Sequence, residues 1–374
     1  MNIGFLELIL FLGISQGIFL ASTLQFIHKN NKVANNTLSL LLLIISIMLL
    51  GRFCYFKYAT NIQFYRFTEF VDIIIFFFGP LLYTYVRRLI VQDSKRFQLP
   101  FYHYTLPLFH FLFFLYTLSY NNSSYNKLLR LGVLNGVYFI IELLGILSVI
   151  FYILKSLILL SRFRKAEKNN LSYHQAISVF LHCLLLGISI FVTLWLCSFL
   201  NRNLQLSLVS NYINYNSVWV SISLFIYIVS FFSLKQPEIF RVQPLEKITE
   251  KKERIDKIEL ERLKNDLEFL MIQEKIYLDH QLSLTQLAKK LNTTTNNTSW
   301  LLNNVHKSSF YDYVNSYRVQ AFIEKIHNGE YKKHTILALS LDVGFSSKST
   351  FNKVFKEITQ QTPSGFIKSI AHSP

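Results

Sequence analysis

Long apolar segments occupy the first two thirds of the chain, and they end near Leu245. A helix needs about 20 predominantly apolar residues to cross the hydrocarbon of a bilayer. Runs of this length predict membrane spans near residues 3–27, 36–58, 68–91, 100–119, 132–160, 176–200 and 212–234. The fourth run is the weakest, because Pro107 and two histidines lie inside it. We therefore expect residues 1–240 to form a transmembrane domain of about seven helices.

The pattern becomes strongly charged after the last apolar run. Residues 241–278 are expected to form a charged linker helix, in which the leucines follow a 3-4-3 spacing. These leucines are Leu260, Leu263, Leu267 and Leu270. The spacing fits a short coiled-coil seam that would pair two protomers into a homodimer. It fits equally well a single amphipathic helix that packs on the following domain, and the sequence leaves both interpretations open.

Two short helices joined by a tight turn are predicted between residues 335 and 366. Apolar residues at helical spacing indicate a first helix from Thr335, its N-cap, to about Asp342. Gly344 follows, and glycine enters the left-handed region without a Cβ penalty. Ser346 is a candidate N-cap for a second helix whose exposed face is small, polar and cationic. This arrangement is typical of a helix-turn-helix whose second helix enters a DNA major groove.

The same stretch, VGFSSKSTFNKVF followed by Thr-Pro and an aromatic residue, resembles the second helix-turn-helix of the AraC-type (AraC/XylS) transcription regulators. The matching positions are Gly344, Phe345, Ser349, Phe351, Phe355, Lys356, Thr362 and Pro363. Three positions depart from the family pattern: Ser340 replaces the usual Ala, Gln360 the usual Gly and Ile367 the usual Arg. The resemblance implies a bacterial regulator that binds double-stranded DNA.

Residues 282–318 resemble the first helix-turn-helix of the same family. Ser283 and Gln286 form a capping-box pattern, and Thr294 is a candidate cap for a first recognition helix, 295 to about 306. The departures here are Thr298 for the usual Leu and Lys307 for the usual Gly. Two such units joined by one stiff helix can lie in successive major grooves, about 34 Å apart.

Candidate DNA contacts lie on the exposed faces of the two predicted recognition helices. Cationic side chains suit phosphate contacts, and asparagine can bond adenine through two hydrogen bonds. The candidates are Asn296, Asn297, Trp300 and Asn303 on the first helix and Ser347, Lys348, Asn352, Lys353 and Lys356 on the second. Each of them could instead be a solvated residue on a helix face.

The net charge of +16 is concentrated in the apolar part of the chain. Up to Leu245 there are 19 Lys and Arg against 7 Asp and Glu, whereas the remainder has 19 against 15. Ten of the positive residues follow spans one, three and five, and only four follow spans two, four and six. The positive-inside rule then predicts a multi-pass protein of the bacterial inner membrane with its N-terminus outside and its C-terminus in the cytoplasm.

Glu142 is an isolated carboxylate inside an apolar span. Ionisable groups at membrane depth are costly, so it is a candidate for sensing a small molecule or another membrane signal. Glu69 and Asp72 lie near the start of another span, and we interpret these two as interfacial or hydrogen-bonded groups.

No catalytic motif is evident in the sequence: there is no phosphate-binding glycine loop, no GxSxG and no HExxH. The sequence thus predicts no enzyme, no cofactor and no metal site. We expect an all-α protein in which a polytopic membrane domain (1–240), a linker helix (241–278) and a tandem helix-turn-helix domain (279–374) couple a membrane signal to promoter binding. The alternative is a transporter or channel that carries a cytoplasmic helical interaction module.

Overall fold

The computed structural model describes residues 4–26, 32–58, 61–91, 97–205, 213–235 and 256–371. These residues are almost entirely helical and contain no strand, apart from one isolated antiparallel bridge between Leu171 and Ser283. The chain divides into two compact units. We call the first the membrane unit (Met1–Ser161 with Ala176–Pro244) and the second the DNA-binding unit (Arg162–Gln175 with Leu245–Pro374). The all-α prediction is confirmed.

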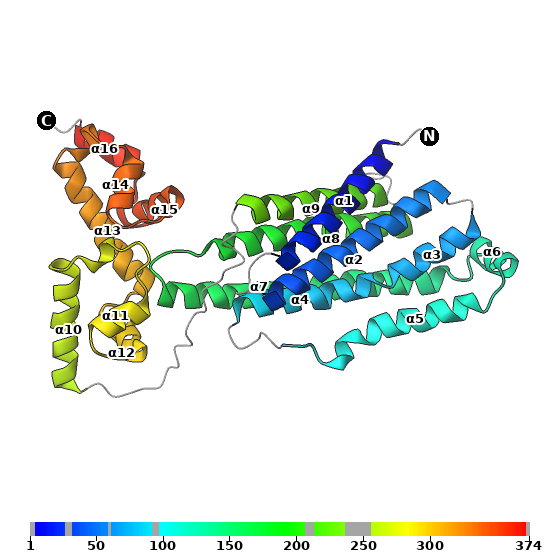
Figure 1. Ribbon diagram of the computed structural model, residues 1–374, viewed down its shortest axis with the longest axis horizontal. Coiled ribbons are helices and arrows are strands. Elements are labelled where there is room, and N and C mark those ends of the chain that lie inside the picture. The colour runs from blue at the N-terminus through cyan, green and yellow to red at the C-terminus, as the bar shows by residue number, and fades with distance from the viewer. Residues whose placement is uncertain are drawn as a thin grey trace. The chain divides into compact units, whose positions relative to one another are not determined.

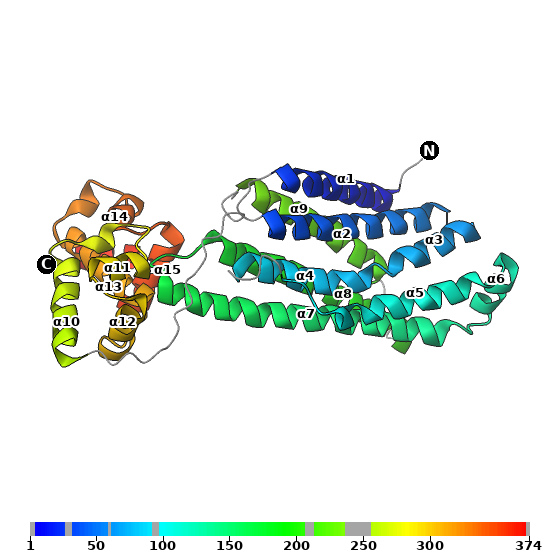
Figure 2. The same cartoon turned by 60° about the horizontal axis from the view of Figure 1, so that its bottom comes forward.

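The membrane unit consists of helices that lie alongside one another (Figures 1 and 2). They are α1 (Phe5–Phe26), α2 (Lys32–Tyr58), α3 (Ile62–Asp72), α4 (Ile75–Ile90), α5 (Thr105–Leu118), α6 (Asn122–Arg130), α7 (Asn135–Asn170), α8 (Ala176–Leu204) and α9 (Tyr215–Lys235). Within the described residues, six helices are long and apolar enough to cross a membrane: Phe5–Phe26, Lys32–Tyr58, Thr68–Ile90, Asn135–Asn170, Ile177–Leu204 and Tyr215–Ser233.

The predicted fourth span, residues 100–119, differs from the others. Pro100 precedes a 3-10 turn, η3 (Phe101–Tyr104), so that α5 begins only at Thr105. The 14 residues of α5 extend for about 21 Å, which is shorter than the hydrocarbon core. An apolar run predicts burial in lipid or protein, but the turn residues at its ends decide how much of the run is helical.

Small residues allow the helices of the membrane unit to approach closely. A Cβ atom on Gly17 of α1 would lie 2.2 Å from the Ser46 Oγ of α2. On the outer side of the unit, large apolar side chains such as Phe11, Phe19 and Leu115 are exposed. Close backbone contact through glycine and serine, with aromatic and aliphatic side chains outside, is typical of helices packed in lipid.

The DNA-binding unit is built around one long helix, α13 (Phe310–His327). Its first half packs with α10 (Lys257–Ile272), η5 (Ile276–Leu278), α11 (Leu284–Lys290), α12 (Thr295–Trp300) and the π-helical turn η6 (Leu301–Val305). Its second half packs with α14 (Ile336–Asp342), α15 (Lys348–Thr359) and α16 (Pro363–Ala371), and η7 (Glu330–Lys332) precedes α14. The unit therefore has two apolar cores that are joined by α13.

The helix starts of this unit follow the predicted capping residues closely. Thr335 accepts a hydrogen bond from the Ala338 N–H at 3.1 Å, and Thr294 accepts one from the Asn297 N–H at 3.1 Å. Ser283 and Gln286 form the predicted capping box. The exception is Ser346, because α15 is capped one residue later.

Ser347 is the N-cap of α15, and its Oγ accepts a hydrogen bond from the Thr350 N–H at 3.2 Å. The N-cap hydroxyl must reach the N–H three residues later, and here the hydroxyl that does so belongs to Ser347. A pair of adjacent serines does not reveal by sequence which of the two will cap the helix.

Of the predicted linker helix, residues 241–255 lie outside the described residues and α10 forms the next part. The helix ends at Ile272, earlier than predicted, because Lys275 adopts a left-handed conformation and Ile276–Leu278 form the 3-10 turn η5. Leu263, Leu267 and Leu270 are buried in the first core, and Leu260 packs against it. The 3-4-3 leucine spacing thus serves packing within the DNA-binding unit. The seam proposed for pairing two protomers is therefore not free on the surface.

Candidate DNA-binding surface and membrane-unit cavity

The turn between α14 and α15 depends on Gly344. Its φ is +94°, and a Cβ atom there would lie 2.5 Å from the Tyr277 carbonyl oxygen and 2.8 Å from that of Leu278. Only glycine tolerates both the conformation and the close approach. Phe345, Phe351 and Phe355 are all buried in the second core, so α15 is fixed by its aromatic face.

The opposite face of α15 presents the predicted contacts to solvent. Lys348, Asn352, Lys353 and Lys356 are all exposed. The Lys353 ammonium lies 3.9 Å from the Glu357 carboxylate, a surface pair that DNA phosphate can compete for. Ser347 is half-buried and its hydroxyl is occupied by the cap, so any contact with DNA would have to share that group.

The first recognition helix is less regular. It is α-helical in α12 and continues as the π-turn η6, which carries Asn303. Asn303 and Trp300 are exposed, and the Asn303 amide donates to the Ser299 Oγ at 3.2 Å. Asn296 and Asn297 are half-buried, and the Asn297 amide donates to the Thr293 Oγ1 at 3.1 Å. The candidates of this helix therefore form a mixed surface of which Trp300 and Asn303 are the most accessible members.

Arg318, on α13, is a buried charge that the sequence pattern did not identify as buried. Its side chain is 1% exposed, and its guanidinium donates to backbone carbonyls of Tyr277 and Asp279, each at 2.7 Å. Burial lowers the pKa of Arg318 to about 10, although the nearby Asp279 opposes this effect. The group remains protonated at neutral pH and holds the start of the first helix-turn-helix against α13.

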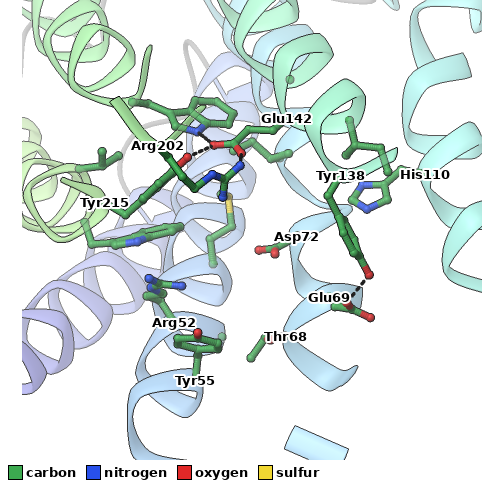
Figure 3. Close-up of a pocket in the computed structure, with 18 of the residues that line it drawn as sticks. Arg52, Tyr55, Thr68, Glu69, Asp72, His110, Tyr138, Glu142, Arg202 and Tyr215 are labelled. Carbon is green, nitrogen blue, oxygen red and sulfur yellow. Dashed lines mark hydrogen bonds and ion pairs between the residues drawn. The ribbon is translucent and has the colours of Figure 1, made fainter. Parts of the chain in front are cut away.

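The membrane unit encloses a cavity of about 770 Å³, which is within the range of small-molecule sites. Glu142 of α7 lies on its wall and accepts hydrogen bonds from Trp195 Nε1 at 2.9 Å and from Tyr215 Oη at 2.7 Å. It also pairs with the Arg202 guanidinium at 2.5 Å (Figure 3). Glu142 therefore connects α7 to α8 and α9 at the cavity.

Three further charged residues line the same cavity. Asp72 lies in the space between Arg52 and the Glu142 cluster, and Glu69 accepts a hydrogen bond from Tyr138 (Figure 3). Glu69 also accepts a hydrogen bond from Tyr125. The Arg52 guanidinium lies over the rings of Tyr55, Phe56 and Trp219. The sequence pattern indicated that Asp72 and Glu69 are interfacial or hydrogen-bonded groups, and Glu69 is hydrogen-bonded. It did not single out Arg52, which is close to the polar end of its apolar run.

Several polar atoms on the cavity wall have no protein partner. They are the Nε of Arg52, the Oε2 of Glu69, the Nε1 of Trp219 and the Nδ1 of His110. Buried polar groups normally have a partner, and one left unpaired costs about 1–3 kcal/mol. The wall is therefore suited to a polar ligand. Among the described residues no group of three or more His, Cys, Asp or Glu could hold a metal ion.

A comparison with known proteins supports the assignment of the C-terminal part. Residues 287–369 match the model of a family described as "Helix-turn-helix domain"; this range begins within α11 and includes α12, α13, α14 and α15. A search of curated proteins and a search of solved structures found no match. The family match supports the AraC-type resemblance, and residues 287–369 are a helix-turn-helix domain of the kind that DNA-binding transcription regulators carry.

Proposed function

We propose that this protein is a membrane-bound, sequence-specific transcription regulator. The observation that carries the proposal is the presence, in one chain, of a tandem helix-turn-helix domain and six helices of membrane-spanning length. The exposed face of α15, with Lys348, Asn352, Lys353 and Lys356, supplies phosphate and base contacts. A transporter or channel is not favoured, because neither function calls for two capped helix-turn-helix units.

The proposed topology has the N-terminus outside and the DNA-binding unit in the cytoplasm of a bacterial cell. In Figures 1 and 2, α5 leads from the end where α4 finishes to the end where α6 begins, so it extends along the other helices. If α5 makes a seventh pass despite its length, the two termini of the membrane unit lie on opposite sides. The positive residues of the predicted inner loops support the same orientation. Of these residues, Lys29, Lys95 and Arg96 lie outside the described ranges.

The signal in this proposal is a small molecule that binds in the membrane-unit cavity. The unpaired donors of Arg52 and Trp219 need an acceptor, whereas the unpaired oxygen of Glu69 and the nearby Asp72 carboxylate favour a donor. A zwitterion that carries an ammonium and a carboxylate satisfies both. Amino acids and their close analogues are the ligand class of this chemistry and size.

A homodimer, if one forms, would use the outer side of α10. Ile258, Phe269 and Ile272 are exposed on this helix, whereas its leucines are buried. Ile258 lies at the start of α10 and Phe269 and Ile272 lie at its end, and a second copy could cover these apolar side chains.

The DNA-binding proposal is tested by selecting sites from random DNA with the full-length protein in lipid nanodiscs, at two salt concentrations. The full chain is needed because residues 162–175 belong to the DNA-binding unit. We expect enrichment of one site with two short blocks about one helical turn apart. Weak, salt-sensitive binding with no preferred sequence would contradict the proposal.

The ligand proposal is tested separately with the twenty protein L-amino acids as probes. Trp195 and Trp219 both line the cavity, so binding should change the intrinsic fluorescence and raise the melting temperature. Arg52→Met should abolish both effects, whereas Lys57→Met, on the same helix and paired with Glu7, should leave them intact. If no amino acid produces either effect, the ligand class is wrong.

A further inference from the structure

The segment that joins α7 to α8 belongs to the DNA-binding unit, although both helices belong mainly to the membrane unit. Leu171 forms the isolated antiparallel bridge with Ser283, the N-cap of α11. The Ser172 N–H and Oγ both donate to the Leu282 carbonyl oxygen, at 3.2 and 2.7 Å. Leu171 and Ser172 are 5% and 1% exposed, so the tip of this connection is built into the first helix-turn-helix. We call residues 162–175 the docking segment.

Arg318 fastens the docking segment to the centre of the DNA-binding unit. Its guanidinium donates to the Ser172 carbonyl oxygen at 2.9 Å and to the Ser172 Oγ at 3.0 Å. Asn315 donates to the same carbonyl at 3.3 Å, and its Oδ1 accepts from Arg318 at 3.0 Å. On the other side, the Arg318 guanidinium lies 5.9 Å from the centre of the Phe345 ring, which begins the turn to α15. Ser172 is thus bound where the two helix-turn-helix units meet.

The docking segment is also held together by hydrogen bonds between its own residues. Glu167, in the last turn of α7, is fully buried and accepts from His174 Nδ1 at 3.0 Å and from the Gln175 N–H at 2.7 Å. The His174 ring stacks on Tyr311 of α13 at 4.7 Å between centroids. The docking segment is therefore held both by a buried carboxylate and by contact with α13.

The same two helices carry the polar cluster of the cavity. Glu142 is on α7, and its partners Trp195 and Arg202 are on α8. From Glu142 to Asn170, α7 extends about 42 Å without interruption. We propose that α7, α8 and the docking segment couple the cavity to DNA binding: a change at Glu142 shifts the two helices, and Ser172 transmits the shift to Arg318. This inference rests on the proposed function, whose regulation it specifies.

The coupling is measured by a double-mutant cycle in the full-length protein in nanodiscs, with the DNA site obtained by selection. Glu142→Ala breaks the cluster in the cavity, and Ser172→Trp expels the docking segment without altering residues 245–374. We expect Glu142→Ala to change the DNA dissociation constant at least about fivefold when Ser172 is present, the lower end of usual coupling between sites. In the Ser172→Trp background we expect Glu142→Ala to change the DNA dissociation constant by less than about twofold.

Two variants serve as controls. Glu7→Ala removes a carboxylate of α1 that pairs with Lys57 and does not line the cavity, so it should leave the dissociation constant unchanged. Lys165→Gln changes an exposed residue of the docking segment and should preserve the effect of Glu142→Ala. If Ser172→Trp unfolds the unit, as judged by amide exchange, the cycle is repeated with Ser172→Ala, which removes only the hydroxyl contacts. In that background we expect the effect of Glu142→Ala on the dissociation constant to be reduced, but less than in the Ser172→Trp background.

Three results are distinguishable. An effect of Glu142→Ala that is the same in both backgrounds overturns the coupling, and so does the absence of any effect in the wild-type background. Failure of the wild-type protein to select a DNA site overturns the proposed function instead. An effect that requires Ser172 supports the transmission through the docking segment.

Discussion

Adjacent residues on α15 would perform different chemistry at the proposed DNA surface. Asn352 and Lys353 are both exposed on the face opposite the buried phenylalanines. An amide can donate and accept at the same base edge and so discriminate between bases, whereas an ammonium attracts phosphate regardless of sequence. The two side chains therefore predict two distinct phenotypes.

Lys353→Ala should weaken binding to all DNA sequences by a similar factor and reduce the slope of log affinity against log salt by about one. Asn352→Ala should relax the preference at one base position, at a cost of about 1–3 kcal/mol for the preferred site. Both are measured by titration against a panel of single-base variants at several salt concentrations. Lys333→Ala, an exposed lysine before α14, is the control. Identical profiles for the two variants would refute the assignment of α15 as a reading helix.

Arg318→Met should destabilise the DNA-binding unit by about 3 kcal/mol. The change leaves four oxygen acceptors of the backbone and of Ser172 without their charged donor, and each charge-assisted hydrogen bond contributes about 1.5–3 kcal/mol before relaxation. The loss of stability is measured as a lower free energy of opening in amide exchange of residues 276–284 and 310–326. Arg262→Met, an exposed residue of α10 in an i,i+4 pair with Asp266, should alter stability by less than about 0.5 kcal/mol.

Among the described residues, five non-glycine residues adopt the left-handed conformation, and two of them stand at helix ends where the AraC-type pattern has glycine. Lys307 has a φ of 51° and Gln360 a φ of 59°. At both positions the AraC-type pattern has glycine. The structure retains the backbone conformation that glycine favours, so the departures noted in the sequence change the strain and not the architecture.

Gln360→Gly should stabilise the DNA-binding unit by about 0.5–1 kcal/mol, because a left-handed residue with a Cβ is strained. The backbone N–H at position 360 donates to the Lys356 carbonyl oxygen at the end of α15, and glycine keeps this hydrogen bond. The gain in the free energy of unfolding is measured by amide exchange in the DNA-binding unit as the temperature is raised. Gln361→Gly, one residue later and not at a positive φ, should bring no gain, and equal stabilisation by both would show that the left-handed strain is not the cause.

Sequence patterns predicted the elements better than their ends and partners. The caps at Thr294 and Thr335, the turn at Gly344 and the aromatic faces follow from local rules, and the structure contains them. The fourth apolar run, predicted to be the weakest span, is helical over a shorter length than predicted, because a 3-10 turn follows Pro100 and α5 begins only at Thr105. The cavity residues Arg52 and Arg202 were missed, since burial of a charge depends on partners that are distant in the sequence, here Asp72 and Glu142.

The molecule as a whole has its two chemistries in separate parts of the chain. Helices long and apolar enough to cross a membrane and a charged cavity belong to the membrane unit, and the exposed cationic face of α15 belongs to the DNA-binding unit. The proposed function assigns the membrane unit a defined orientation in the membrane.

The proposed orientation predicts which residues are accessible from outside the cell. In a variant whose native Cys54, Cys183 and Cys197 are replaced, a cysteine introduced at the exposed Ser123 of α6 should react with a membrane-impermeant thiol reagent in intact cells. A cysteine at the exposed Lys333 should react only after permeabilisation. The opposite pattern would place the DNA-binding unit outside and would exclude the regulator.

The docking segment has a consequence for how the DNA-binding unit could ever leave the membrane. Because residues 162–175 and 245–374 form one compact body, the polypeptide passes between the two units three times, after Ser161, after Gln175 and after Pro244. Cleavage by a protease at the last of these passages alone would leave the body attached through α7 and α8, with Arg318 still bound to Ser172. A liberated transcription factor would require either several cuts or the loss of a buried arginine's partners. For the proposed regulator, this architecture favours action at the membrane, so that the promoter must move to the membrane-bound protein.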